Sequence, residues 1–365
     1  MLYELFEKLA ESLNIEGFTY SHKIALESAL ICALVFVLTC IAGKIIIPIL
    51  RAKKMNQPIN VYVAEHKGKA GTPTMGGICF IIASLFVMLI WIILERSGVI
   101  GRADDKALLP FALTLMLGVG NALIGFVDDY KKLVKKENEG LTSMQKMILQ
   151  IIVAAAYLAM MGITDNLITK LHIPFTNVDF DLGFFAYPLY LLVIVGFVNS
   201  TNITDGLDGL ASSVGCAVSV GLIVVPVLSV KHFLMYQPAA PRYSALIAAS
   251  LLGALLGFLV FNHYPAKVFM GDTGSLYIGG IIMGCAIMQG ELLSVVIMGF
   301  VFIFEMLSSL MQTLYYKATG GKRIFKKAPV HHHFQMCNWS EVKIVTVFFI
   351  VSALLTAIGA IGAII

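Results

Sequence analysis

Charged residues are scarce in this chain. Asp, Glu, Lys and Arg make up 13% of its 365 residues, against about 25% in an average soluble domain. Apolar residues make up 58%, and the mean hydropathy is +0.87. A soluble enzyme or a nucleic-acid-binding protein would carry more charge. The composition therefore predicts an integral membrane protein, and we expect no nucleic acid among its partners.

Two further patterns are lacking. The six cysteines share no paired spacing, so we expect small buried side chains rather than disulfides or a cysteine metal site. The segment 67–77 combines basic, hydroxyl and glycine residues, as a phosphate-binding loop does. It contains no GxxxxGK[ST] pattern, however, which excludes a Walker A loop.

Long apolar runs are abundant. A helix needs about 20 apolar residues to cross a bilayer. About ten apolar segments, of which the fifth and eighth are short, predict one all-α transmembrane domain over residues 23–365. Residues 1–22 differ, because apolar and charged side chains alternate there with helical spacing, which predicts an amphipathic surface helix. The predicted spans lie near 25–50, 74–94, 107–127, 147–163, 186–201, 209–230, 243–261, 275–289, 292–316 and 342–364.

The basic residues are unevenly distributed between the loops. Most of the 26 Lys and Arg fall in the four loops that follow the first, third, seventh and ninth spans. The positive-inside rule makes these loops cytoplasmic and places both termini outside the cell membrane. One outer loop, 171–185, contains Pro174, alternating apolar residues and Gly183, which indicates a short periplasmic hairpin.

The polar segments whose side chains could take part in binding or catalysis all fall on the predicted cytoplasmic side. Chance would scatter such segments over both faces, so their clustering predicts a single active face at the boundary between membrane and cytoplasm. They are residues 67–77, 128–136, 199–209, 262–275 and 322–333.

Asp128 and Asp129 follow an apolar run directly. Adjacent carboxylates repel each other, so a cation or a shared proton would stabilise them. Such a pair suits Mg²⁺ binding or proton abstraction. A solvated helix end beside Lys131 and Lys132 is the structural alternative, and the sequence leaves both interpretations open.

Two other acidic segments lie next to helix starts. Asp205 and Asp208 follow Asn199 and Asn202, and simple helix capping would not require all four polar residues. Asp272 stands between two glycines ahead of the eighth span. A helix start can receive a phosphate, and Mg²⁺ on this acid would make the site attractive to anions. A capped turn is the alternative at both places.

Three consecutive histidines, His331 to His333, follow a basic segment. Three adjacent imidazoles rarely face one tetrahedral metal, so contact with a charged substrate is favoured over a zinc site. Acids with Mg²⁺ suit displacement at phosphorus, and the lysines can bind phosphates. A site at the membrane surface suits one soluble and one lipid-borne substrate.

Five motifs carry a resemblance to a known family. The chain from about residue 25 onwards resembles the polyprenyl-phosphate N-acetylhexosamine-1-phosphate transferase superfamily. The histidine motif is similar to that of the branch with N-acetylmuramoyl-pentapeptide donors, rather than that of relatives with N-acetylglucosamine donors. The motifs are GTPTMGG (71–77), GFVDDY (125–130), NITDGLDGL (202–210), VFMGDTGS (268–275) and PVHHHF (329–334).

The resemblance implies a reaction between UDP-N-acetylmuramoyl-pentapeptide and undecaprenyl phosphate that gives lipid I and UMP. It also implies Mg²⁺ as cofactor, a homodimer, and a place in the bacterial cytoplasmic membrane with membrane lipid around it. The implied catalytic residues are Asp128, Asp129, Asp272 and His331, with Asp272 as the metal ligand. The implied substrate-binding residues are Lys69, Thr74, Lys132, Lys146, Asn202, Asp205, Asp208, Asn262, Phe269, Gly271, His332 and His333.

Two alternatives remain at this stage. A sister transferase would use UDP-N-acetylglucosamine as its donor. A secondary transporter would place its polar residues near the middle of the bilayer, often in repeated halves. The sequence has no such repeat, and Glu305 is the one acid well inside a predicted span. The residues themselves assign no role to Glu305.

Overall fold

Long apolar helices make up most of the chain in the computed structural model, which describes residues 20–53, 71–100, 105–135, 140–229 and 240–365. The elements are α2 (Tyr20–Ala52), α3 (Gly77–Arg96), α4 (Asp105–Lys135), α5 (Ser143–Ile163), β1 (Lys170–Ile173), β2 (Val178–Asp181), the 3₁₀ turn η2 (Gly183–Phe185), α6 (Ala186–Thr204), α7 (Leu210–Leu228), α9 (Ala240–Asn262), α10 (Gly271–Gln289), α11 (Leu292–Met298), α12 (Phe300–Ala318), α13 (Val330–Gln335) and α14 (Glu341–Ile364).

Nine of the described helices are long and apolar enough to cross a membrane, and the bent pair α11–α12 makes a tenth candidate. The prediction of an all-helical membrane protein with about ten spans is confirmed. All six cysteines are free thiols. Residues 1–19 lie outside the described part of the chain, so the amphipathic N-terminal helix stays a prediction.

The outer loop forms the expected hairpin. β1 and β2 pair in antiparallel fashion, with Lys170 opposite Asp181. The Asp181 carboxylate accepts hydrogen bonds from the Gly183 amide (2.9 Å) and the Thr169 hydroxyl (2.8 Å). These donors lower the pKa of Asp181 and fix the turn that leads into α6.

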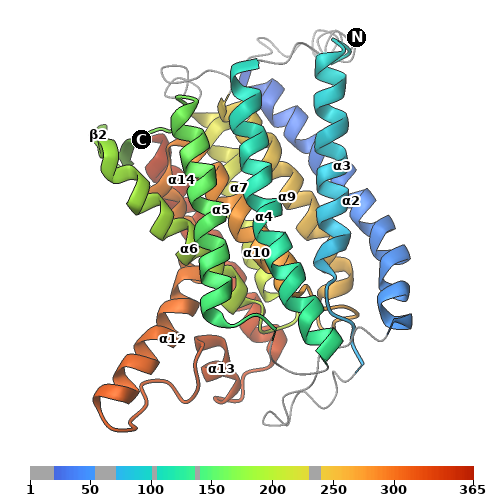
Figure 1. The fold of residues 1–365 in the computed structure, drawn as a ribbon, viewed down its shortest axis with the longest axis vertical. Coiled ribbons are helices and arrows are strands. Elements are labelled where there is room, and N and C mark those ends of the chain that lie inside the picture. Colours follow the sequence, from blue (N-terminus) through green and yellow to red (C-terminus); the bar gives the residue numbers. More distant parts are fainter. Residues whose placement is uncertain (1–19, 54–70, 101–104, 136–139, 230–239) are drawn as a thin grey trace.

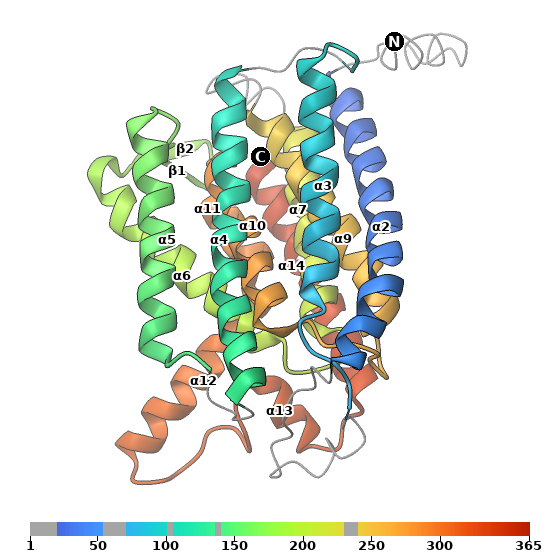
Figure 2. The same ribbon diagram turned by 45° about the vertical axis from the view of Figure 1, so that its right-hand side comes forward.

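Helix α10 runs through the middle of the bundle, with α4, α6 and α9 packed around it (Figures 1 and 2). Small residues allow this close approach. A Cβ added at Gly280 of α10 would lie 3.0 Å from the Cα of Gly118 in α4. The first turn of α10 lies at the same end of the bundle as the last turns of α4, α6 and α9, and the end of α14 lies at the other (Figure 1).

The ninth predicted span, 292–316, is a broken helix. α11 and α12 meet at Gly299 with a bend of 74°. The ring of Phe197 lies where a side chain at Gly299 would be, 2.5 Å from an added Cβ. The bend directs α12 out of the bundle, and the chain then returns along 319–329 to α13 beneath the bundle (Figures 1 and 2).

A buried charge network joins three helices at the end of the bundle opposite α13. Arg242 at the start of α9 donates to Glu27 of α2 (2.6 and 2.9 Å) and to Glu95 of α3. Tyr243 and Trp91 also donate to Glu95, at 2.7 and 3.2 Å. Arg242 is 7% exposed, and buried charges persist only when they are paired in this way.

Replacement of Arg242 by Ala should destabilise the protein, because it leaves two buried carboxylates facing each other. Removal of one partner from a buried pair typically costs about 3–5 kcal/mol. Thermal unfolding in detergent measures the loss, with the exposed Lys322→Ala as the control. Equal unfolding midpoints for the two variants would show that the network contributes little.

Candidate active site

The paired acids Asp128 and Asp129 lie inside α4 rather than at its end. The helix continues to Lys135, although the apolar run ends at Val127. Lys132 follows Asp128 by one turn, and its ammonium lies 2.7 Å from the Asp128 carboxylate. Such i,i+4 pairs support a helix, so the charged turn remains helical. Asp128 and Asp129 are only 2% and 4% exposed.

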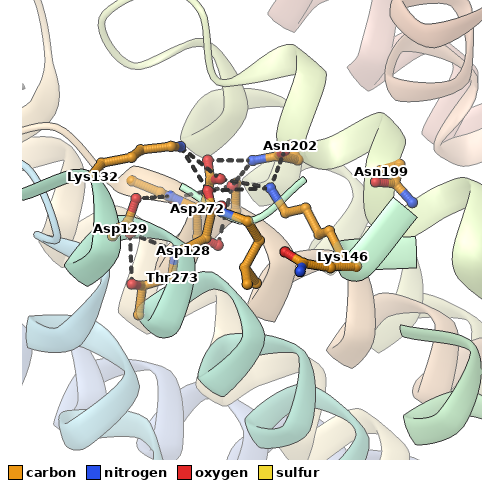
Figure 3. A network of polar contacts seen from close by, with 12 residues as sticks. Asp128, Asp129, Lys132, Lys146, Asn199, Asn202, Asp272 and Thr273 are labelled. Atoms are coloured by element: carbon orange, nitrogen blue, oxygen red, sulfur yellow. Dashed lines mark hydrogen bonds and ion pairs between the residues drawn. The ribbon is translucent and has the colours of Figure 1, made fainter. Parts of the chain in front are cut away.

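Asp272, in the first turn of α10, meets this pair (Figure 3). One carboxylate oxygen from each of Asp128, Asp129 and Asp272 lies within 4.8 Å of the others. We call these three residues the acid cluster. In the described part of the chain it is the one group of three or more His, Cys, Asp or Glu with ligand atoms so close together.

Two lysines balance the charge of the acid cluster. Lys132 and Lys146 place their ammonium groups 3.1 and 2.6 Å from the same oxygen of Asp272. Lys146, from the first turn of α5, also lies 3.7 Å from Asp128. Three carboxylates and two ammonium groups leave one negative charge, which favours a further cation.

Asn202, near the end of α6, connects the acid cluster to a third helix. Its amide nitrogen donates to Asp272 (2.8 Å) and its oxygen accepts from Lys146 (3.2 Å). Asn199, one turn earlier, points away from the cluster (Figure 3) and instead exchanges hydrogen bonds with Gln150 of α5. Asn199 and Asn202 therefore have different hydrogen-bond partners, although they lie only three positions apart in the sequence.

Asp129 caps the start of α10 from a neighbouring helix. Its carboxylate accepts from the backbone amides of Asp272 (3.2 Å) and Thr273 (2.9 Å) and from the Thr273 hydroxyl (2.7 Å). The first amides of a helix need such acceptors. A Cβ at Gly125 would overlap the backbone of Asp272, so this glycine permits the close approach of α4 that the cap requires.

Asp208 and Asn262 join two loops beside the cluster. Asp208 accepts from the amide of Ala266 (2.9 Å). Asn262 accepts from the amide of Gly209 (3.1 Å) and donates to the carbonyl of Val268 (3.0 Å). These bonds fix the loop before α7 against the loop before α10. Both side chains are buried.

Thr74 and Phe269 lie on two extended segments that pair with each other. The Phe269 amide donates to the carbonyl of Pro73 (2.8 Å), and its carbonyl accepts from Gly76 (2.9 Å). Gly271 has a φ of +74°, a conformation that favours glycine. A Cβ added at Gly271 would lie 3.1 Å from the Thr74 hydroxyl. Lys69 lies outside the described residues.

Asp205 ends α6 and lies close enough to the acid cluster to be affected by its charge. Burial, and after it the negative charges of Asp272 and Asp129, raise the pKa of Asp205 well above its usual value. The structure thus brings Asp205 into the electrostatic neighbourhood of the cluster, although it is not one of the three residues whose oxygens converge.

His331 is held by Glu305. The Nδ1 atom of His331 lies 2.9 Å from the Glu305 carboxylate, and the two residues are 1% and 0% exposed. Among the described residues, His331 Nε2 and the second Glu305 oxygen have no hydrogen-bond partner. A Cβ at Gly206 would overlap the His331 ring, so the ring faces the loop between Asp205 and Asp208.

The other two histidines have different partners. His332 Nδ1 lies 2.7 Å from Gln335, and His333 accepts from the amide of Lys326 at 3.1 Å. The His333 ring packs edge-on against Phe325. The three imidazoles therefore do not converge on one point in the described structure, and their contact with substrate stays a prediction.

Glu305 is the residue of this site that sequence reasoning left without a role. Its signal was present, because an ionisable residue inside an apolar span is costly and commonly functional. The sequence does not give its partner, since His331 is 26 positions away and the bend at Gly299 sets the direction of α12.

Comparison with known proteins gives matches over most of the chain. The pattern that defines glycosyl transferase family 4 matches residues 111–290, and phospho-N-acetylmuramoyl-pentapeptide-transferase signature 1 matches residues 69–81. The chain is 40% identical to the phospho-N-acetylmuramoyl-pentapeptide-transferase of Staphylococcus carnosus over 89% of its length and 95% of that relative. It is also 40% identical to the enzyme of that name from Halalkalibacterium halodurans, over 90% and 96%.

Replacement of Asp129 by Ala should lower the free energy of unfolding by about 1–3 kcal/mol, because buried amides at the start of α10 lose their acceptor. Asp129→Asn keeps one acceptor oxygen and should lose less. Thermal unfolding in detergent, without any ligand, compares the two variants. If the Ala variant unfolds at the wild-type temperature, Asp129 is not the cap of α10.

Proposed function

The chain belongs to the phospho-N-acetylmuramoyl-pentapeptide transferases of glycosyl transferase family 4, and we propose that its chemistry takes place at the acid cluster. The enzyme transfers phospho-N-acetylmuramoyl-pentapeptide from its UDP donor to undecaprenyl phosphate, giving lipid I in the first membrane step of peptidoglycan synthesis. The observation that supports the proposed location is the meeting of three carboxylates with two ammonium groups where α4 passes the first turns of α5 and α10.

The residues of the acid cluster fit Mg²⁺. Carboxylate oxygens are the ligands that this ion prefers, and the cluster keeps one negative charge after its two lysines are counted. Asp272 would hold the ion, with Asp128 beside it, while Asp129 is already engaged by the first amides of α10. When bound, the ion would neutralise the diphosphate of the donor.

Lys132 and Lys146 are the proposed phosphate contacts. Both ammonium groups lie in the cluster, where a phosphate oxygen would replace a carboxylate as their partner. A phosphate oxygen of the lipid attacks the phosphorus next to the sugar, and UMP leaves. The lipid phosphate has a second pKa of about 6 and needs no base at neutral pH. Asp128 therefore acts as an organiser that holds Lys132.

Donor recognition involves the loops around the cluster. Phe269 would stack on uracil, with Lys69, Asp208 and Asn262 at the uridine. The bonds of Asp208 and Asn262 support this indirectly, because they fix the loops that would form such a pocket. The proposed ribose, phosphate and sugar contacts are Thr74, Asn202, Asp205, Gly271, His331, His332 and His333. A homodimer, which the family resemblance implies, stays a prediction.

Asp272→Asn should reduce UMP release by several orders of magnitude, because the amide is a poor ligand for a divalent cation and a poor partner for the two lysines. The variant should remain folded in detergent. Mg²⁺ should raise the unfolding temperature of the wild type, since a ligand that binds only the folded state stabilises it, but not that of the variant. Near-normal turnover in the variant would reject the proposed metal role.

Glu305→Leu should lower kcat at least about tenfold, because the orientation and tautomer of His331 are no longer fixed. The Michaelis constant for the donor should change less. Glu305→Gln keeps an acceptor for Nδ1 and should recover part of the rate. Ser308→Ala is the matched control, since the Ser308 hydroxyl contacts only backbone: it accepts from the Val330 amide (3.0 Å) next to His331 and donates to the Glu305 carbonyl (2.7 Å). An equal loss of kcat in Ser308→Ala would show that Glu305 has only a structural role.

A further inference from the structure

A second polar contact joins α5 to α6, one helical turn farther from the acid cluster than Lys146. The side-chain nitrogen of Asn199 donates to the Gln150 oxygen (2.7 Å), and the Gln150 nitrogen donates in return to Asn199 (3.4 Å). Residues three or four positions apart lie on one face of a helix, so Lys146 and Gln150 of α5 face Asn202 and Asn199 of α6. The two helices therefore share two successive contacts, Lys146 with Asn202 (3.2 Å) and Gln150 with Asn199 (Figure 3).

Gln150 is the first residue of α5 that is buried in the bundle. It is 1% exposed, whereas the residues before it in the helix, 143–149, are all exposed except for the half-buried Lys146. Met144, Met147 and Ile148 are among them, as expected of a helix whose outer face meets lipid. The start of α5 thus has no apolar packing of its own, and polar contacts must hold it in place.

The other polar contacts of this end of α5 involve the acid cluster or the helix itself. The Leu141 amide donates to Asp128 (2.6 Å), and the Lys146 ammonium lies beside Asp128 and Asp272. Thr142 and Gln145 bond to each other in a capping box. In the described part of the chain, the Gln150–Asn199 pair is therefore the contact between this end of α5 and another helix that includes neither Lys146 nor an acid.

This difference matters when the substrates bind. A phosphate oxygen that becomes the partner of Lys146 replaces Asp272, so the ion pair that fixes the start of α5 is given up during turnover. The amide pair carries no charge and lies one turn away from the exchange. A misplacement of about 1 Å in an active site can cost about a hundredfold in rate. A contact that survives the exchange keeps the ammonium group at the reacting phosphates.

We propose that Gln150 is a positioning residue, which together with Asn199 keeps Lys146 at the acid cluster while a phosphate replaces Asp272 as its partner. This inference rests on the function proposed above, because the phosphate contact of Lys146 is part of it. Gln150 itself touches no reacting group. Its amide fixes the register of α5 on α6, and through that register it fixes the place of the ammonium group.

The test exchanges the two amide side chains. Gln150→Asn and Asn199→Gln each change the length of one partner, and Gln150→Met removes its amide at nearly the same size. We expect kcat for UMP release to fall at least about tenfold in each of these variants, because Lys146 is displaced, with the Michaelis constant for the donor changed less. The double variant Q150N/N199Q keeps the combined length of the pair and should recover most of the lost rate.

Tyr157→Phe is the matched control. Tyr157 lies two turns farther along the same buried face of α5, and its hydroxyl donates to the Gly284 carbonyl of α10 (3.5 Å), far from the acid cluster. This variant also loses a buried polar contact of α5, but its kcat should stay within about twofold of the wild type. Unfolding temperatures in detergent show whether each protein is folded. If Gln150→Met does not fold, the two length variants and their combination decide the question.

Three results would overturn the proposal. They are a wild-type kcat in Gln150→Met, an equal loss of kcat in Gln150→Met and Tyr157→Phe, and losses that multiply in Q150N/N199Q instead of being rescued. Lys146→Ala separates this inference from the proposed function. Near-normal turnover in Lys146→Ala would reject the phosphate contact itself, whereas a large loss there beside an unaffected Gln150→Met would reject only the positioning role.

Discussion

The crowding of three carboxylates between α4 and α10 is the constraint on which the catalytic end of this protein depends. Each acid alone would be unfavourable in a buried place. Together they persist because Lys132 and Lys146 share Asp272 and because α10 offers its first amides to Asp129. The close packing of α4 against α10 at Gly125 thus serves both the stability of the bundle and the geometry of the site.

Much of this architecture could be predicted from the sequence. Apolar length gave the spans, charge bias indicated the active face, and the outer hairpin followed from its alternating residues. The predicted clustering of acids is present as well, because polar side chains at one end of an apolar bundle are stabilised by contact with one another. Asp128 and Asp272 are 144 positions apart, yet their carboxylates lie next to each other (Figure 3).

The partners within the site could not be predicted, for physical reasons. Residue type does not distinguish Asn202, which binds Asp272, from Asn199, which binds Gln150, because helical rotation decides which of them faces the cluster. Asp129 looked equivalent to Asp128 but caps another helix. The pairing of Glu305 with His331 depends on the bend at Gly299, and local sequence does not encode the direction of such a bend.

The two charged networks of the bundle differ in a way that separates structure from catalysis. In the network at the opposite end, Arg242 is committed to Glu27 and Glu95. Glu95 also accepts from Tyr243 and Trp91, so its oxygens have little capacity for a new partner. In the acid cluster, both ammonium groups converge on one oxygen of Asp272, and a negative charge remains. Each network has one more carboxylate than cations, so net charge does not distinguish them. A site that must accept phosphates and a cation needs partners that can be exchanged, and the two ammonium groups that share one oxygen of Asp272 suit the acid cluster to chemistry, whereas the committed bonds of Arg242 suit the arginine network to support.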